Sequence, residues 1–304
     1  MKKIEGLIAA VFTPFHEDGS VNREMIGLLV DKLAADGVTG IFICGSNGEG
    51  PNMTTKERME VAEEFVRAVR KRLYIILHVG HSSIADAKAL ATHGASIGVD
   101  AFSAVAAFYF KPVSVHNLAN CMAEIAAAAP QIPFYYYHIP HLTGVSMDMM
   151  EFLKFAGPRI PNLAGIKYTA PTIQEYQSCL NFESGKFDIL YGLDELLLPA
   201  LAVGAKAAIG STYTFAAPIY LKTISLFNEG KTEAARNNHA FMVEVIRVML
   251  KFPPIPAQKA IMKMLGWNIG PSRLPLTTLE PDSYDQLYRD LDQLTFFEKV
   301  SSKK

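Results

Sequence analysis

Two short apolar runs, Gly40-Ile41-Phe42-Ile43 and Tyr74-Ile75-Ile76-Leu77, flank a helical segment at 54–71, and together they indicate the fold class. Neither run alternates apolar with polar residues, which is typical of parallel strands that are covered on both faces. The helical segment opens with Thr54 or Thr55 as its N-cap. A strand, a helix and a second parallel strand form the repeating unit of α/β folds.

The same unit recurs along most of the chain. Eight strands are predicted, at 6–13, 40–45, 74–80, 101–107, 133–138, 164–168, 187–192 and 207–211. Helices are predicted between and after them, at 25–36, 54–71, 86–98, 115–129, 147–155, 173–182, 195–203 and 216–228. Eight βα units in series favour a (β/α)8 TIM barrel. A doubly wound open sheet is the alternative, although such a sheet usually has fewer units and a Gly-rich nucleotide turn.

The chain after the eighth unit has a different pattern. Helices are predicted at 232–252, 257–265 and 282–297 with no strand between them, and prolines at 253, 254 and 256 separate the first two. We therefore expect a barrel over residues 1–228. A C-terminal helical extension over 229–304 is expected to pack on it, so that both parts form a single structural unit.

Composition excludes several classes of protein. Hydrophobic residues make up 50% of the 304 residues and charged residues 19%, which excludes a disordered chain. The formal net charge of −1 gives no basic excess, so we expect no nucleic-acid partner. Three widely spaced cysteines, Cys44, Cys121 and Cys179, predict no disulfide framework and suit a reducing compartment. No apolar run is long enough to span a membrane, so a soluble cytoplasmic protein is expected.

Lys167 is the first candidate for chemistry. TIM-barrel active sites lie at the C-terminal ends of the strands, and Lys167 stands near the end of the sixth predicted strand, between Ile166 and Tyr168. Burial would favour the neutral amine, which can attack a ketone and form a Schiff base. The residues alone leave open a lysine that extends to solvent or pairs with a carboxylate.

Tyr137, near the end of the fifth predicted strand, is a candidate proton shuttle. Strand alternation places it on the same face as Tyr135 and opposite Tyr136. Three consecutive tyrosines are also typical of packing residues, so the pattern leaves both roles open.

Three acidic residues, on two loops, accompany these candidates. The second strand ends in Gly45-Ser46-Asn47-Gly48-Glu49-Gly50, whose backbone N–H groups can converge on an anion. Glu49 either binds a ligand or braces this loop. Asp194 and Glu195 start a predicted helix, where they either complement its dipole or accept hydrogen bonds from a polyhydroxylated substrate.

His78 and His81 form a possible metal pair, but positions three apart lie on different faces of a strand. We expect polar histidines with satisfied hydrogen bonds instead. Cys44 is interpreted as a small core residue.

The order of the motifs is specific. A GSxGE loop from Gly45, a YxxP strand end from Tyr137, a GxKxT strand from Gly165, a GxDE turn from Gly192 and a GST turn from Gly210 follow one another on the eight units. With them the chain resembles the N-acetylneuraminate lyase branch of the dihydrodipicolinate synthase and N-acetylneuraminate lyase family. The resemblance covers nearly the whole chain, from Thr13-Pro14-Phe15 through Lys222 and on to 258–261 and 270–275.

This resemblance implies a class I aldolase that cleaves N-acetylneuraminate (sialic acid) reversibly to N-acetylmannosamine and pyruvate. Lys167 matches the Schiff-base residue and Tyr137 the proton shuttle. Ser46 and Asn47 match the pair that holds the substrate carboxylate, and Asn47 stands where the lyases usually carry Thr. Positions that bind the sugar chain are matched by Thr169, Gly192, Asp194, Glu195 and Ser211. Neither a cofactor nor a metal is implied, because the covalent imine is the electron sink.

Assembly and branch are also implied by the resemblance. Tyr109 matches a tyrosine that reaches a neighbouring subunit's site, which implies a homotetramer. The synthase branch carries an Arg two residues after the strand-end Pro, where this chain has Leu142, so a synthase is disfavoured. Keto-deoxy-sugar aldolases share the Lys and the Tyr and remain the alternative. A keto-acid-binding barrel without activity is a third hypothesis.

Overall fold

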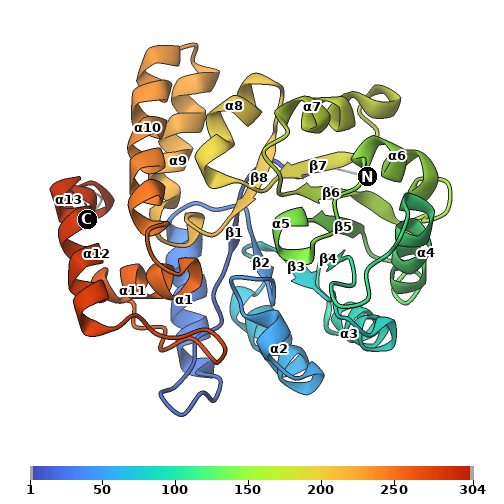
Figure 1. Ribbon diagram of the computed structural model, residues 1–304, viewed down its shortest axis with the longest axis horizontal. Coiled ribbons are helices and arrows are strands. Elements are labelled where there is room, and N and C mark those ends of the chain that lie inside the picture. The colour runs from blue at the N-terminus through green and yellow to red at the C-terminus, as the bar shows by residue number, and fades with distance from the viewer. Residues whose placement is uncertain (1–2, 302–304) are drawn as a thin grey trace.

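Eight parallel strands close into a barrel in sequential order, β1 to β8 (Figure 1). This computed structural model describes residues 3–301. Residues 1–2 of the predicted barrel region and residues 302–304 of the predicted extension lie outside the described residues. The strands are β1 Gly6–Ala10, β2 Gly40–Ile43, β3 Tyr74–His78, β4 Ala101–Val105, β5 Phe134–His138, β6 Leu163–Tyr168, β7 Asp188–Tyr191 and β8 Ala207–Gly210. The TIM barrel and all eight predicted strands are confirmed, and the open sheet is excluded.

Helices follow the strands as predicted and surround the barrel. They are α1 Arg23–Ala35, α2 Thr55–Val69, α3 Ile84–Ile97, α4 Val115–Ala126, α6 Met149–Ala156, α7 Ile173–Asn181, α8 Leu197–Ala202 and α9 Tyr213–Asn228. Thr54 is the N-cap of α2, and its reciprocal hydrogen bonds with Glu57 form a capping box. A short helix after β5, α5 Pro140–Thr143, was not predicted.

Three helix predictions need correction. The segment 195–203 is a 3₁₀ turn, Asp194–Leu196, followed by α8, because Leu196 has a non-helical backbone. The segment 282–297 is two helices, α12 Pro281–Gln293 and α13 Phe296–Ser301, separated where Thr295 has a φ of 56°. The helix predicted at 257–265 is α11, Pro254–Met264, and it starts within the proline cluster. Proline is tolerated there because the N–H groups of a first helical turn have no partner within the helix.

Apolar side chains form two layers. Inside the barrel, Tyr135 and Tyr137 pack with Phe42, Ile76 and Leu190. Tyr136 belongs to the outer layer between strands and helices. The predicted alternation of the three tyrosines is therefore confirmed, and it directs Tyr137 into the barrel.

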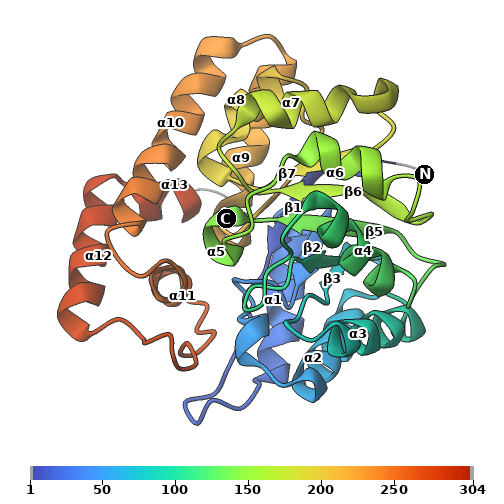
Figure 2. The same ribbon diagram turned by 45° about the vertical axis from the view of Figure 1, so that its right-hand side comes forward.

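The C-terminal helices gather on one side of the barrel in both views (Figures 1 and 2). Helix α10, Thr232–Met249, packs along α9, and α12 packs against α10 and α11. The division at 228/229 stays a prediction. Within residues 3–301, no helix is both long and apolar enough to cross a membrane.

Candidate active site

Lys167 projects from β6 into the barrel and is 3% exposed. Its ammonium nitrogen lies 3.6 Å from the centre of the Tyr137 ring and 4.8 Å from that of Phe42. It forms no ion pair with any carboxylate of residues 3–301. The two structural alternatives, a lysine in solvent and a lysine in a salt bridge, are thus excluded.

Burial also sets the protonation of Lys167. Desolvation lowers its pKa to about 7, and the nearby charge of Asp194 acts in the opposite direction. A substantial fraction of the amine is therefore neutral near pH 7, which is the form that attacks a carbonyl carbon.

Tyr137 lies directly beside Lys167, because the two residues are partners in the β5–β6 register. Burial raises the pKa of its phenol to about 12, while the hydroxyls of Ser46 and Thr169 lower it. The phenol therefore keeps its proton at neutral pH. Phe42 and His78 meet the ring edge-on, at centroid distances of 5.5 and 5.7 Å.

His78 was not predicted to contact these residues. Its Nδ1 lies 3.1 Å from the carbonyl oxygen of Cys44, and its Nε2 is buried without a hydrogen-bond partner in the described part of the chain. The expectation that this histidine is fully satisfied is therefore wrong. Since a carbonyl only accepts, Nδ1 carries the proton, and burial lowers the pKa so far that the ring stays neutral.

Sequence alternation contained a signal for His78, because Ile76 faces the barrel interior two positions earlier. His81 lies outside the barrel on the following loop, where its Nδ1 accepts a hydrogen bond from the Ser83 N–H at 2.9 Å. The two histidines therefore do not converge.

Asp194 is buried after β7 and is held rigidly. Its Oδ2 accepts hydrogen bonds from the backbone N–H and the hydroxyl of Thr212, at 2.8 and 2.6 Å. Burial raises its pKa to about 6 against the effect of these bonds. Its Oδ1 lies 1.8 Å from the position that a Cβ would take at Gly210, so only glycine leaves room for this carboxylate.

Gly192 has a matching steric role. A Cβ at this position would stand 2.0 Å from the Thr169 hydroxyl oxygen. The absence of a side chain at 192 therefore lets Thr169 lie beside Tyr137.

Four predicted residues lie at the rim, partly exposed at the ends of β2, β7 and β8: Ser46, Asn47, Glu195 and Ser211. Together with the buried Lys167, Tyr137, Thr169 and Asp194, they occupy the C-terminal ends of β2, β5, β6, β7 and β8 on one end of the closed barrel. Glu49 does not join them, because it is buried and its carboxylate binds the C-terminal extension.

Tyr109 lies apart from this group. It is 78% exposed on the loop between β4 and α4, next to Phe110, which is 86% exposed. Within one chain, Tyr109 does not reach Lys167.

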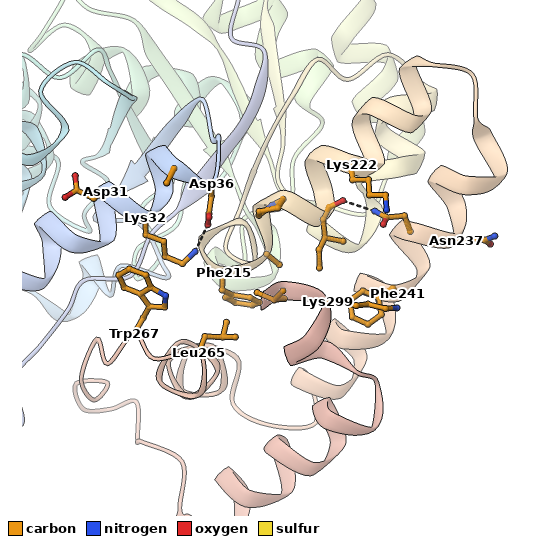
Figure 3. A pocket seen from close by; sticks show the side chains of 16 residues that line it. Asp31, Lys32, Asp36, Phe215, Lys222, Asn237, Phe241, Leu265, Trp267 and Lys299 are labelled. Atoms are coloured by element: carbon orange, nitrogen blue, oxygen red, sulfur yellow. Dashed lines mark hydrogen bonds and ion pairs between the residues drawn. The ribbon is translucent and has the colours of Figure 1, made fainter. Parts of the chain in front are cut away.

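A cavity of about 980 Å³ lies elsewhere, on the outside of the barrel (Figure 3). It is lined by α1, α9 and the C-terminal helices, including Lys32, Phe215, Phe241 and Trp267. Lys32 is bound to Asp36 and to the Thr214 carbonyl oxygen. None of the predicted site residues lines this cavity, so it marks the seam where the extension meets the barrel.

Comparison with known proteins agrees with this geometry. Residues 3–294 match the dihydrodipicolinate synthetase family. N-acetylneuraminate lyase of Sus scrofa is 38% identical over 97% of this chain and 95% of its own. The structure of N-acetylneuraminate lyase (sialic acid aldolase) from Aliivibrio salmonicida is 43% identical with a TM-score of 0.94, over 97% of this chain and 98% of that chain.

The Proteus mirabilis N-acetylneuraminate lyase structure is similar to the same degree. It is 40% identical with a TM-score of 0.94, over 97% of this chain and 100% of that chain. The strand order, the length of the match and the family match all agree. The chain therefore belongs to the dihydrodipicolinate synthetase family.

Proposed function

We propose that the protein is a class I aldolase that cleaves N-acetylneuraminate reversibly to N-acetylmannosamine and pyruvate. The observation that carries the proposal is the buried Lys167, whose amine lies 3.6 Å from the Tyr137 ring centre and is partly neutral near pH 7. A charged surface lysine could not attack a ketone at this pH. Relatives at 38–43% identity bear the name of this activity.

In the proposed reaction, Lys167 attacks C2 of the keto acid, and loss of water gives a protonated imine. Removal of the proton from the C4 hydroxyl then breaks the C3–C4 bond, and its electron pair moves to the imine nitrogen. The aldehyde product leaves, C3 is reprotonated, and water releases pyruvate from Lys167. The imine is the electron sink, so the proposed reaction uses neither a metal nor an organic cofactor.

Tyr137 is the proposed carrier of the C4 proton. A phenol with a pKa of about 12 holds its proton at neutral pH, so it takes up the C4 proton as it passes its own proton to the substrate carboxylate, with Ser46 at its hydroxyl. Ser46 and Asn47 are proposed to hold that carboxylate at the N–H groups of their loop. Thr169, Gly192, Asp194, Glu195 and Ser211 are proposed to line the path of the sugar chain.

Keto-deoxy-sugar aldolases remain the alternative, because cleavage of a shorter sugar acid needs the same Lys167 and Tyr137. Leu142 argues against a dicarboxylic substrate, since it lies half exposed on α5 and offers no charge. The carboxylates of Asp194 and Glu195 favour a longer, polyhydroxylated chain.

We further propose a homotetramer in which Tyr109 completes a neighbouring site. Exposed Tyr109, Phe110 and Val113 on one loop support this, because apolar side chains grouped on a surface favour contact with another chain. A cytoplasmic location is proposed from the three unpaired cysteines, which suit a reducing compartment.

Trapping with pyruvate and borohydride tests the proposal. Reduction of the imine should leave a stable mass adduct, and peptide mapping should place it on Lys167. Lys259 is an internal control, because it is equally buried but is paired with Glu49 at 2.6 Å, and the Glu49 charge favours its protonated form. An adduct absent from Lys167 would exclude the aldolase and favour a binding barrel.

Substrate range is tested by pyruvate release. N-acetylneuraminate, N-glycolylneuraminate and 2-keto-3-deoxygluconate are compared at equal concentrations, with EDTA present in a parallel series. We expect cleavage of the sialic acids and no effect of EDTA. Faster release from 2-keto-3-deoxygluconate would transfer the assignment to the shorter-sugar aldolases.

A further inference from the structure

The loop that carries Ser46 has a strained backbone at both ends. Cys44 and Glu49 have φ values of 57° and 52°, in the left-handed region that non-glycine residues rarely adopt. Each such residue costs on the order of 1–3 kcal/mol and persists only where its surroundings hold it. Contacts with other segments therefore have to hold this loop.

The C-terminal extension supplies two of them. Glu49 Oε1 pairs with the Lys259 ammonium at 2.6 Å, and its Oε2 accepts a hydrogen bond from the Arg273 N–H at 2.8 Å. Lys259 lies on α11 and also donates to the carbonyl oxygen of Pro271 at 2.7 Å. We call Glu49, Lys259 and Arg273 the C-terminal clamp.

The same segment fixes the far side of the loop. The Arg273 guanidinium binds Glu57, the capping-box residue of α2, at 2.6 Å and the Gly19 carbonyl oxygen at 2.8 Å. Lys259 and Arg273 both lie against the ring of Phe15. The chain between β2 and α2 is thus attached to the extension at Glu49, one of its two strained residues, and at Glu57, at the start of α2.

Stability alone does not account for such a pair. A buried ion pair loses most of its Coulomb energy to desolvation, and apolar residues of similar volume often stabilise a fold as well. The clamp fixes the orientation of Glu49, because its carboxylate is bound by two donors from different segments, Lys259 and Arg273. A displacement of about 1 Å in a binding group can change a rate by about 100-fold.

We propose that the C-terminal clamp positions the Ser46–Asn47 loop to receive the substrate carboxylate, so that the extension takes part in keto-acid binding without touching the ligand. This inference rests on the proposed function of the loop. Glu49, Lys259 and Arg273 act as positioning residues.

Two variants test it, Glu49→Gln and Lys259→Met. The half-saturating pyruvate concentration for borohydride trapping should rise at least tenfold in both, while the adduct at saturating pyruvate stays complete because Lys167 is intact. Hydrogen exchange of the amides in 45–50 should accelerate at least tenfold, with no change in β5. Lys251→Met is the matched control, since it removes an ion pair with Asp290 within the extension at 2.9 Å and should leave both readouts unchanged.

The double variant Glu49→Gln/Lys259→Met separates positioning from stability. It leaves no unpaired buried charge, so it should fold even where Lys259→Met does not. A persistent rise in half-saturating pyruvate supports the clamp. A return to the wild-type value, or faster loop exchange with unchanged pyruvate binding, would overturn it. Wild-type protein that traps no pyruvate would instead refute the proposed function.

Discussion

Lys167 and Tyr137 are partners across two neighbouring strands, and the Lys167 nitrogen lies 3.6 Å from the centre of the Tyr137 ring. Both side chains are buried, yet burial acts on them in opposite directions. It lowers the pKa of the lysine to about 7 and raises that of the phenol to about 12. The result at neutral pH is a partly neutral amine, which can attack a carbonyl carbon, beside a protonated phenol, which can relay a proton only by giving up its own.

Replacing Lys167 with Met should abolish both turnover and pyruvate trapping, and it should also stabilise the fold. The buried amine has a pKa of about 7 when folded, against 10.5 as its ordinary value, so the folded state disfavours its proton. The free-energy cost of burying the charged amine is complete below pH 7, where both states are protonated, and it disappears as the pH rises toward 10.5. We expect Lys167→Met to raise the free energy of unfolding at pH 6.5 by on the order of 2–4 kcal/mol.

Calorimetric melting at pH 6.5 and at pH 9.5 measures this difference, which should shrink at the higher pH. Lys259→Met provides the contrast, because it leaves the buried Glu49 carboxylate without a countercharge and should destabilise the fold by about 3–5 kcal/mol. A Lys167→Met variant less stable than wild type at pH 6.5 would show that burial of the charged amine does not destabilise the fold.

The rate of pyruvate trapping should follow the free amine of Lys167. Below pH 7 the rate should rise about tenfold per pH unit, and above pH 7 it should level off, because the pKa is about 7. Stopped borohydride reactions between pH 5.5 and 9 measure the profile. A midpoint near 10, the value of an exposed lysine, would contradict the burial argument.

Replacing Tyr137 with Phe should lower kcat by about 10²–10⁴-fold and leave trapping nearly intact. The ring that packs against Lys167 is kept, and only the hydroxyl that is proposed to move the proton is lost. Tyr135→Phe is the matched control, because Tyr135 faces the same interior but donates to Asp188 at 3.0 Å near the start of β7. Its loss should reduce stability by about 1 kcal/mol without changing kcat. An effect of Tyr137→Phe on KM alone would mean that Tyr137 only binds.

The barrel was predictable because its signal is local. Continuous apolar runs marked the strands, and alternation correctly directed Tyr135 and Tyr137 inward and Tyr136 outward. The helix boundaries that failed, at Leu196 and Thr295, depend on single backbone angles that no periodicity encodes.

The partners of the site residues were less predictable. Lys259 and Arg273 lie more than 200 residues from Glu49, and no sequence pattern joins them. The contact of His78 with Tyr137 likewise depends on how β3 and β5 are placed around the closed barrel. Residue types at strand ends thus predicted the candidates for chemistry. The groups that hold these candidates in place could be identified only from the three-dimensional structure.

The exposed loop between β4 and α4 offers a test of the proposed homotetramer. In the proposed homotetramer the native mass is four times the 33.4 kDa of the chain, and Tyr109 and Phe110, which are 78% and 86% exposed in a single copy, would contact another subunit. Tyr109→Ser/Phe110→Ser should shift the mass distribution toward smaller species and lower kcat/KM. Leu250→Ser removes an exposed apolar side chain at the end of α10 and should change neither. Fully active wild-type monomer in sedimentation would contradict the assembly.

Asp194 and Glu195 should differ in what their replacement changes. Asp194 is buried and bound by Thr212, and its charge raises the pKa of Lys167. Asp194→Asn keeps an oxygen for the Thr212 N–H but removes that charge, so the trapping profile should shift to lower pH. Glu195 is partly exposed at the rim. Its replacement by Gln should leave the profile unchanged and raise KM for N-acetylneuraminate several-fold.

Cleavage of a shorter keto-deoxy sugar should be spared in Glu195→Gln, because that substrate lacks the hydroxyls that the carboxylate would bind. A site built to pair with hydroxyls discriminates strongly, since its polar groups are left unpaired by a ligand without them. If Glu195 only complemented a helix dipole, its charge would contribute well under ~1 kcal/mol to stability and nothing to specificity. Initial rates on both substrates, with each variant, separate the two roles. Equal losses on long and short substrates would remove the argument for sialic acid and favour the shorter-sugar aldolases.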